Sequence, residues 1–193
     1  VNDSMLHGQF DFPLYWQIVR AFARNETTLE DLASVLQGSL SFYNGVMSPF
    51  LGNHDIPRFV SHAAGQIEDV WGNGSKEQGF YNPPSQPSEA GPYRSLRLAQ
   101  SFLYAIPGIP LTYYGDEIGM VGAGDPDNRR MMTFSDWNEE QQATYDHLGT
   151  LGSVRAAWRS LRRGSFQVVS AGADDMVIQR SLENETVLIV LNR

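Results

Sequence analysis

Asn53, His54 and Asp55 form the polar cluster whose residue types and position most favour chemistry. They follow the apolar run 45–52 and come directly before the turn-like residues 56–58. A carboxylate and an imidazole therefore stand where a buried strand is expected to end. For an isolated tripeptide a surface Asx turn is the simpler interpretation, but the carboxyl ends of strands carry the active site in α/β barrels. The position therefore favours a functional role.

Two more groups of charged residues follow the next apolar run. Asp116 and Glu117 come directly after it, and Asp125 and Arg129 lie in the loop beyond. If the strand ends share one face, these side chains line one cleft with the 53–55 cluster. Retaining glycosidases use a pair of carboxyl groups as acid and nucleophile, so a carboxylate pair across this cleft would by itself suggest a self-sufficient site.

Strand and helix patterns alternate along the chain in the order that positions these residues. Alternating βα units with apolar strands indicate a parallel sheet, either open or closed as a barrel. The first expected elements are a strand at 9–12, a helix from Pro13, a helix with a Thr27 and Glu30 capping box, and a strand ending before Asn53. A helix at 93–105, a strand at 109–114 and a long helix that Gly164 ends follow. The apolar residues at helical spacing are Leu14, Ile18, Val19 and Phe22 in the first helix, Leu96, Ala99, Phe102 and Leu103 in 93–105, and Leu148, Leu151, Val154, Trp158 and Leu161 in the long helix.

After Gly164 the pattern changes to short strands without helices, at 166–169, 176–181 and 186–191. This change predicts an antiparallel meander, and it divides the chain into an α/β part, residues 1–164, and the start of a β domain, residues 165–193.

Residues 64–92 are too long for an ordinary α/β connection, yet they contain aromatic side chains. Such side chains are costly to leave in a disordered linker. We expect this stretch to form a partly ordered cover over a cleft.

Composition argues against several functions. The net charge of −8 disfavours nucleic acid and anionic membranes as partners, and no apolar run approaches the ~18 residues of a membrane span.

The chain has no cysteine, its histidines lack metal-ligand spacing, and its serines lack a nucleophile-elbow context. Residues 122–124 lack the Lys-Ser/Thr of a phosphate loop. Residues 125–136 begin like a calcium loop, but Arg130 and Asp136 replace its Gly and Glu.

The motifs resemble those of the α-amylase family of retaining glycoside hydrolases. Residues 50–55 (FLGNHD) resemble the end of the family's seventh barrel strand, residues 108–119 (GIPLTYYGDEIG) its eighth strand, and residues 125–129 (DPDNR) the loop beyond. Residues 10–14 are similar to the sixth-strand segment. The resemblance covers nearly the whole chain except 64–92. It implies the C-terminal portion of a TIM (β/α)8 barrel, strands six to eight with helices, followed by the first strands of an antiparallel β domain.

The resemblance also implies roles for individual residues. Asp55 would grip the hydroxyls of the sugar at the cleavage point and stabilise the transition state, without being nucleophile or acid. His54 would hydrogen-bond the same sugar, and Asp125 and Arg129 would hold the next sugars on the non-reducing side. Glu117 would brace the strand end. The family's nucleophile Asp and acid Glu lie on strands four and five, upstream of these residues, so the segment alone is not expected to be active.

We therefore expect an intact enzyme that cleaves α-glucosidic bonds in starch-like or malto-oligosaccharide substrates. In it, these residues would join the missing N-terminal barrel strands of the same protein. The alternatives are a transglycosylase of the same family and a non-catalytic relative that serves as a binding or assembly scaffold. No cofactor is expected in this segment, whereas the family resemblance allows a structural calcium in the intact protein. A secreted or periplasmic location is favoured over a cytoplasmic one.

Overall fold

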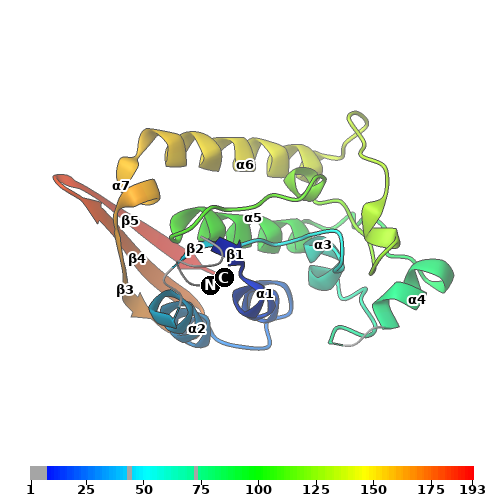
Figure 1. Ribbon diagram of the computed structural model, residues 1–193. Coiled ribbons are helices and arrows are strands. Elements are labelled where there is room, and N and C mark those ends of the chain that lie inside the picture. Colours follow the sequence, from blue (N-terminus) through cyan, green and yellow to red (C-terminus); the bar gives the residue numbers. More distant parts are fainter. Residues whose placement is uncertain (1–7, 43–44, 72–73) are drawn as a thin grey trace.

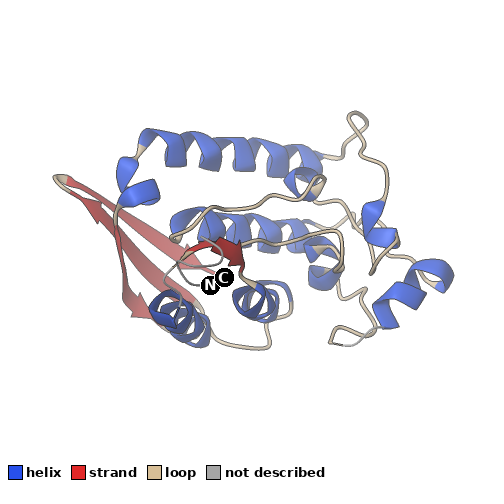
Figure 2. Cartoon of the chain, viewed as in Figure 1, coloured by secondary structure: helices blue, strands red, loops and turns tan. Residues whose placement is uncertain are grey.

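The computed structural model describes residues 8–42, 45–71 and 74–193. Helices make up most of the molecule, with an antiparallel sheet at one end and helix α4 at the other (Figure 1). Two very short strands lie between the helices (Figure 2). No helix within the described ranges is long and apolar enough to cross a membrane.

The short strands form the parallel sheet that the alternating pattern predicts. Strand β1 (Gly8–Phe10) pairs in parallel with β2 (Val46–Ser48). An isolated parallel bridge then joins Phe50 to Leu111, so three chain segments lie in parallel. The strands are shorter than expected, and 109–114 contains only the bridge. Proline explains part of the loss, because Pro49 and Pro110 lack the N–H that a ladder requires.

Asp11 ends β1 and starts the first helix. Helix α1 (Phe12–Ile18) is capped by Asp11 Oδ1, which accepts a hydrogen bond from Leu14 N at 3.1 Å. The expected strand at 9–12 is therefore wrong at its last two residues. A π-helical turn, η1 (Val19–Ala23), continues α1. The apolar positions predicted to face inward are all buried: Leu14, Ile18, Val19 and Phe22.

Helix α2 (Leu29–Phe42) begins with a capping box one residue later than expected. Thr28 Oγ1 accepts from Asp31 N at 3.0 Å, and Asp31 Oδ2 accepts from Thr28 N at 3.1 Å. The pair is therefore Thr28 and Asp31 rather than Thr27 and Glu30. The reciprocal geometry is that of a capping box with Asp in place of the usual Glu.

Two helices flank the long connection after β2. Helix α3 (Phe59–Ala63) packs on α5 (Ala90–Ala105), and between them α4 (Gly74–Tyr81) occupies part of 64–92. Helix α5 starts three residues before the expected 93–105 and buries the predicted face, namely Leu96, Ala99, Phe102 and Leu103.

The long C-terminal helix is broken rather than continuous. Helix α6 (Glu139–Ala157) ends at Trp158, whose extended backbone separates it from α7 (Arg159–Arg163). Val154 and Trp158 are exposed, contrary to the predicted apolar face. The face toward α5 is instead polar: Arg97 Nη1 donates to Thr144 Oγ1 at 3.1 Å, and Arg155 Nη1 donates to Tyr104 O at 2.6 Å. Two short 3₁₀ turns, η2 (Asp116–Ile118) and η3 (Asp127–Arg129), precede α6.

The predicted meander is present after Gly164. Strands β3 (Ser165–Ala171), β4 (Asp175–Leu182) and β5 (Glu185–Asn192) form an antiparallel sheet in that order. Met176, Ile178 and Leu191 belong to the same hydrophobic core as α1, α2 and α5. The separation into domains at residue 164 stays a prediction.

Candidate active site

The chain turns at the carboxyl end of β2 in the way that the 53–55 motif suggests. Asp55 N donates to Asn53 Oδ1 at 2.8 Å, which closes an Asx-type turn. This turn presents two functional groups to solvent, because the side chains of His54 and Asp55 are 58% and 62% exposed. His54 Nε2 lies 3.4 Å from Asp55 Oδ1. The turn and the functional interpretation are therefore compatible.

Arg129 brings the other predicted residues to this turn. Its Nε donates to His54 O at 3.0 Å and lies 2.8 Å from Asp125 Oδ1. Its Nη2 lies 3.7 Å from Asp55 Oδ1. The structure thus brings His54, Asp55, Asp125 and Arg129 together, which gives an exposed cluster with two carboxylates, an imidazole and a guanidinium.

Asn128 fixes the distance between the two loops that carry the cluster. Its side chain is buried, and Nδ2 donates to Asn53 O at 3.2 Å and to Ile56 O at 2.8 Å. Arg58 Nε in turn donates to Asn128 O at 2.9 Å. Sequence reasoning assigned no role to Asn128 or Arg58. Nothing in their local spacing indicates that they are buried.

A buried ion pair lies beneath the cluster. Arg58 Nη1 lies 3.0 Å from Asp116 Oδ1 and donates to Tyr114 O at 2.5 Å. The guanidinium also stacks over the rings of Tyr113 and Tyr114, at 4.2 and 4.8 Å from their centroids. Burial raises the pKa of Asp116 to about 6, although the Arg58 charge acts in the opposite direction.

Asp116 therefore does not line the cleft, contrary to the expectation from sequence. It forms part of the support that was expected of Glu117. The Glu117 side chain is partly buried, and its Oε2 has no hydrogen-bond partner among the described residues. Close packing also limits Gly52, where a Cβ atom would stand 2.6 Å from Asp116 Oδ2.

The 64–92 stretch reaches the cluster from the side. Trp71 and Lys76 line a pocket of about 230 Å³ together with Asp55 and Trp16. The expected ordered cover thus has a defined helix, α4, and a wall next to Asp55.

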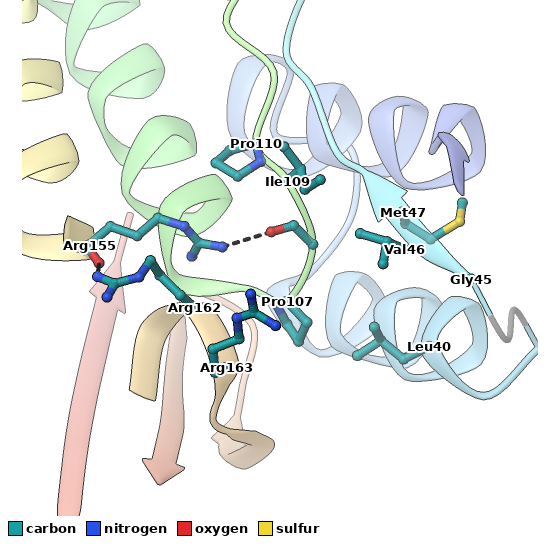
Figure 3. Close-up of a pocket in the computed structure, with 11 residues that line it drawn as sticks. Leu40, Gly45, Val46, Met47, Pro107, Ile109, Pro110, Arg155, Arg162 and Arg163 are labelled. Carbon is teal, nitrogen blue, oxygen red and sulfur yellow. Dashed lines mark hydrogen bonds between the residues drawn. The ribbon is translucent and has the colours of Figure 1, made fainter. Parts of the chain in front are cut away.

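A larger concavity of about 570 Å³ lies at the opposite end of the parallel strands. Figure 3 shows its lining, which includes Val46 and Met47 at the start of β2 and Ile109 at the start of the Leu111 segment. Arg155 closes one side by donating from Nη2 to Gly108 O at 2.7 Å. In barrels the amino ends of the strands serve stability rather than catalysis. We call this surface the strand-start concavity.

Comparison with known proteins agrees with the motifs. No family model matches the chain. A cyclomaltodextrinase from Geobacillus thermopakistaniensis is 31% identical over the whole chain, and a cyclomaltodextrin glucanotransferase from Paenibacillus macerans is 29% identical over the whole chain. The chain spans 30% and 23% of the length of these relatives.

A solved structure supports the same relationship. The α-amylase from Geobacillus thermoleovorans, complexed with acarbose, superposes on 96% of this chain with a TM-score of 0.74 and 32% identity, and the chain covers 36% of it. The relatives named above are hydrolases or transferases of the α-amylase family, and the structural neighbours imply a TIM barrel followed by an antiparallel sheet. The chain belongs to the α-amylase family, as its motifs predicted.

Proposed function

We propose that the intact protein is an α-glucan-active retaining glycoside hydrolase, and that this chain contributes barrel strands six to eight and the start of the next β domain. One observation carries the proposal. The residues that the motifs nominate, His54, Asp55, Asp125 and Arg129, form one exposed cluster at the carboxyl end of the parallel strands. The α-amylase in the structural comparison holds acarbose, which supports an α-glucan as the ligand here.

Asp55 is suited to stabilise a transition state through sugar hydroxyl groups. Its carboxylate is 62% exposed, and its contact with Arg129, at 3.7 Å, leaves room for hydroxyl donors. His54 would hydrogen-bond the same sugar. Asp125 and Arg129, joined at 2.8 Å, would hold the next sugars.

The nucleophile and the acid would come from upstream strands. A retaining mechanism needs two carboxyl groups about 5 to 5.5 Å apart on either side of the bond. Asp116 cannot supply one of them, because it is buried and paired with Arg58. The segment is therefore a supporting half of the proposed site.

The open strand edges support association with those upstream strands. In the described part of the chain, β1 and the Leu111 segment each pair only with the β2 chain, and apolar Phe10, Val46 and Ile109 are exposed nearby. Unpaired edges and apolar surface of this kind favour covering by further chain. The described residues contain no group of three or more His, Cys, Asp or Glu side chains that could hold a metal ion.

Replacing Asp55 by Asn in the intact protein tests the proposed role. We expect kcat on malto-oligosaccharides to fall about 100-fold, equivalent to ~2.7 kcal/mol, with substrate binding largely retained. Asp146→Asn, on α6 away from the cluster, is the matched control and should leave kcat unchanged. Near-normal turnover by the Asp55 variant would exclude this role.

Transglycosylation is the second candidate, and the glucanotransferase relative favours it. Both reactions share a glycosyl-enzyme intermediate, which water or a sugar hydroxyl then intercepts. Product analysis separates them: new reducing ends indicate hydrolysis, whereas longer or cyclic glucans indicate transfer. An intact protein without either activity, and without the upstream Asp and Glu, would instead be a binding or assembly scaffold.

A further inference from the structure

The pocket beside Asp55 is lined in part by a stretch of chain that the family motifs do not cover. Its volume is about 230 Å³. The lining includes Trp16 from α1, Asp55 from the site, and Val70, Trp71, Ser75 and Lys76 from the 64–92 stretch. Pockets for drug-sized ligands begin at about 300 Å³, so this pocket suits one small ring rather than a long ligand. We call it the Trp71 pocket.

Trp71 is held in place without being buried. Its ring centroid lies 5.3 Å from that of Trp16, with the planes at 61°, and the Arg20 guanidinium lies 5.1 Å from the ring. Half of the Trp71 side chain is nevertheless exposed. An indole that is oriented by its neighbours and still open to solvent is a ready-made surface for stacking.

The stretch that contains Trp71 is hydrogen-bonded to, and packed against, the loop that holds Asp125 and Arg129. Gly124 N donates to Ser75 O at 2.9 Å, and a Cβ atom at Gly79 would stand 2.6 Å from Asp127 Cβ. Internal bonds also order the stretch, since the buried Gln78 accepts from Glu68 N at 3.1 Å. The Trp71 pocket is therefore built onto the same framework as the cluster.

The charged groups at the pocket suit a polyhydroxylated ligand. Lys76 is the only lysine of the chain, is exposed, and forms no ion pair within the described ranges. Its ammonium offers donors for hydroxyl oxygens, and the Asp55 carboxylate offers acceptors. A pyranose ring presents C–H groups on its faces, which match the negative face of an indole ring. Together these features match one sugar unit.

We infer that the Trp71 pocket binds one further glucosyl unit of the α-glucan, outside the positions assigned to Asp55, His54, Asp125 and Arg129, and so sets a preference for longer substrates. The inference rests on the proposed function and extends it to a subsite lined by Val70, Trp71, Ser75 and Lys76. The unit would stack on Trp71, and Lys76 would donate to its hydroxyl groups.

Kinetics of the intact protein on malto-oligosaccharides of increasing length test the inference. For Trp71→Ala we expect kcat/KM on long substrates to fall about 3- to 10-fold, as stacking energies imply. On the shortest substrate that is cleaved, kcat/KM should stay unchanged. Trp71→Phe should retain most of the length preference. Phe80→Ala is the matched control, because Phe80 is an exposed aromatic residue of the same stretch that does not line the pocket.

The outcomes separate this inference from the proposed function. An unchanged length preference in Trp71→Ala overturns the subsite, and so does an equal loss on all substrates, which would place Trp71 in the central site. Wild-type protein without activity on α-glucans overturns the proposed function instead. In that case the tryptophan fluorescence change on adding maltohexaose still tests the pocket. If the sugar binds there, the change should become smaller in Trp71→Phe, with the remainder coming from Trp16, and an unchanged signal would overturn the subsite. Melting curves of Trp71→Ala and Trp71→Phe show whether either variant is folded.

Discussion

Arg58 connects the three chain segments on which the site depends. Its guanidinium contacts Asp116, Tyr114 O and Asn128 O, and the whole side chain is buried. Tyr114 and Asp116 lie in the segment after α5, and Asn128 lies in the loop before α6. A buried charge of this kind is costly when its partner is removed, because the remaining charge stays out of water.

We therefore expect Arg58→Met to destabilise the intact protein strongly. The free energy of unfolding at pH 7 should fall by about 3 to 5 kcal/mol, since Asp116 loses its cation in the interior. Urea denaturation measures the change. Arg159→Ala is the control, because the Arg159 and Glu183 side chains are 63% and 71% exposed and their ion pair spans 3.9 Å. Such surface pairs contribute little that can be measured.

The contribution of Asp116 to the free energy of unfolding depends on pH. Burial raises the pKa of Asp116 to about 6, above the ordinary value of about 3.9 for Asp. The folded state therefore holds this proton more tightly than the unfolded state. The associated stability is fully present below about pH 4 and is lost as pH rises through about 6. The destabilisation by Arg58→Met should consequently be smaller at pH 5 than at pH 7. Equal losses at both pH values would contradict the pairing.

The start of α2 links the helices to the antiparallel sheet. The N–H groups of Leu29 and Glu30 lie in its first turn and have no partner within the helix. They donate to Ala173 O and Gly172 O, at 3.0 Å each, in the turn between β3 and β4. The capping box supplies another acceptor, Thr28 Oγ1. The first turn of α2 is thus satisfied by its own cap and by a distant hairpin.

Thr28→Ala should weaken this junction. Loss of an N-cap typically costs about 1 kcal/mol of stability. The Thr28 hydroxyl is also the main cause that lowers the pKa of Asp31, so that pKa should rise in the variant. Denaturation and NMR titration measure the two effects. Glu30→Ala is the control, because Glu30 is not part of the observed capping box. A larger loss of stability in Glu30→Ala than in Thr28→Ala would instead support the Thr27 and Glu30 capping box expected from sequence.

The strand-start concavity leaves apolar surface exposed. Val46 and Ile109, which line it, are 52% and 64% exposed. Exposed apolar concavities beside unpaired strands promote association. In an intact barrel, strands from upstream would cover this surface.

Two lysine substitutions test that interpretation. The 193-residue chain produced alone should self-associate, and Val46→Lys with Ile109→Lys should reduce the association seen in light scattering. The same double variant should destabilise the intact protein, because the lysines would then be buried. Val154→Lys, on the exposed surface of α6, should change neither property. Equal stability of the intact wild type and double variant would show that this surface is not covered.

Local patterns predicted much of the fold and of the candidate site. Helical periodicity identified α5 and its buried face, and strand alternation identified the meander, because both depend on residues close in sequence. The cluster of His54, Asp55, Asp125 and Arg129 was also predictable. Loops that follow parallel strands meet at the same edge of a sheet, so residues far apart in sequence can be placed together from their order alone.

The order and spacing of the motifs were enough to indicate the family and the composition of the exposed cluster. How the cluster is supported, and which residues lie beside it, depend on tertiary packing. The Arg58–Asp116 pair joins residues 58 positions apart, and the Trp71 pocket joins α1 to the 64–92 stretch. Local pattern does not specify such contacts, because whether a charged or aromatic side chain is buried, paired or open depends on which distant segments pack against it.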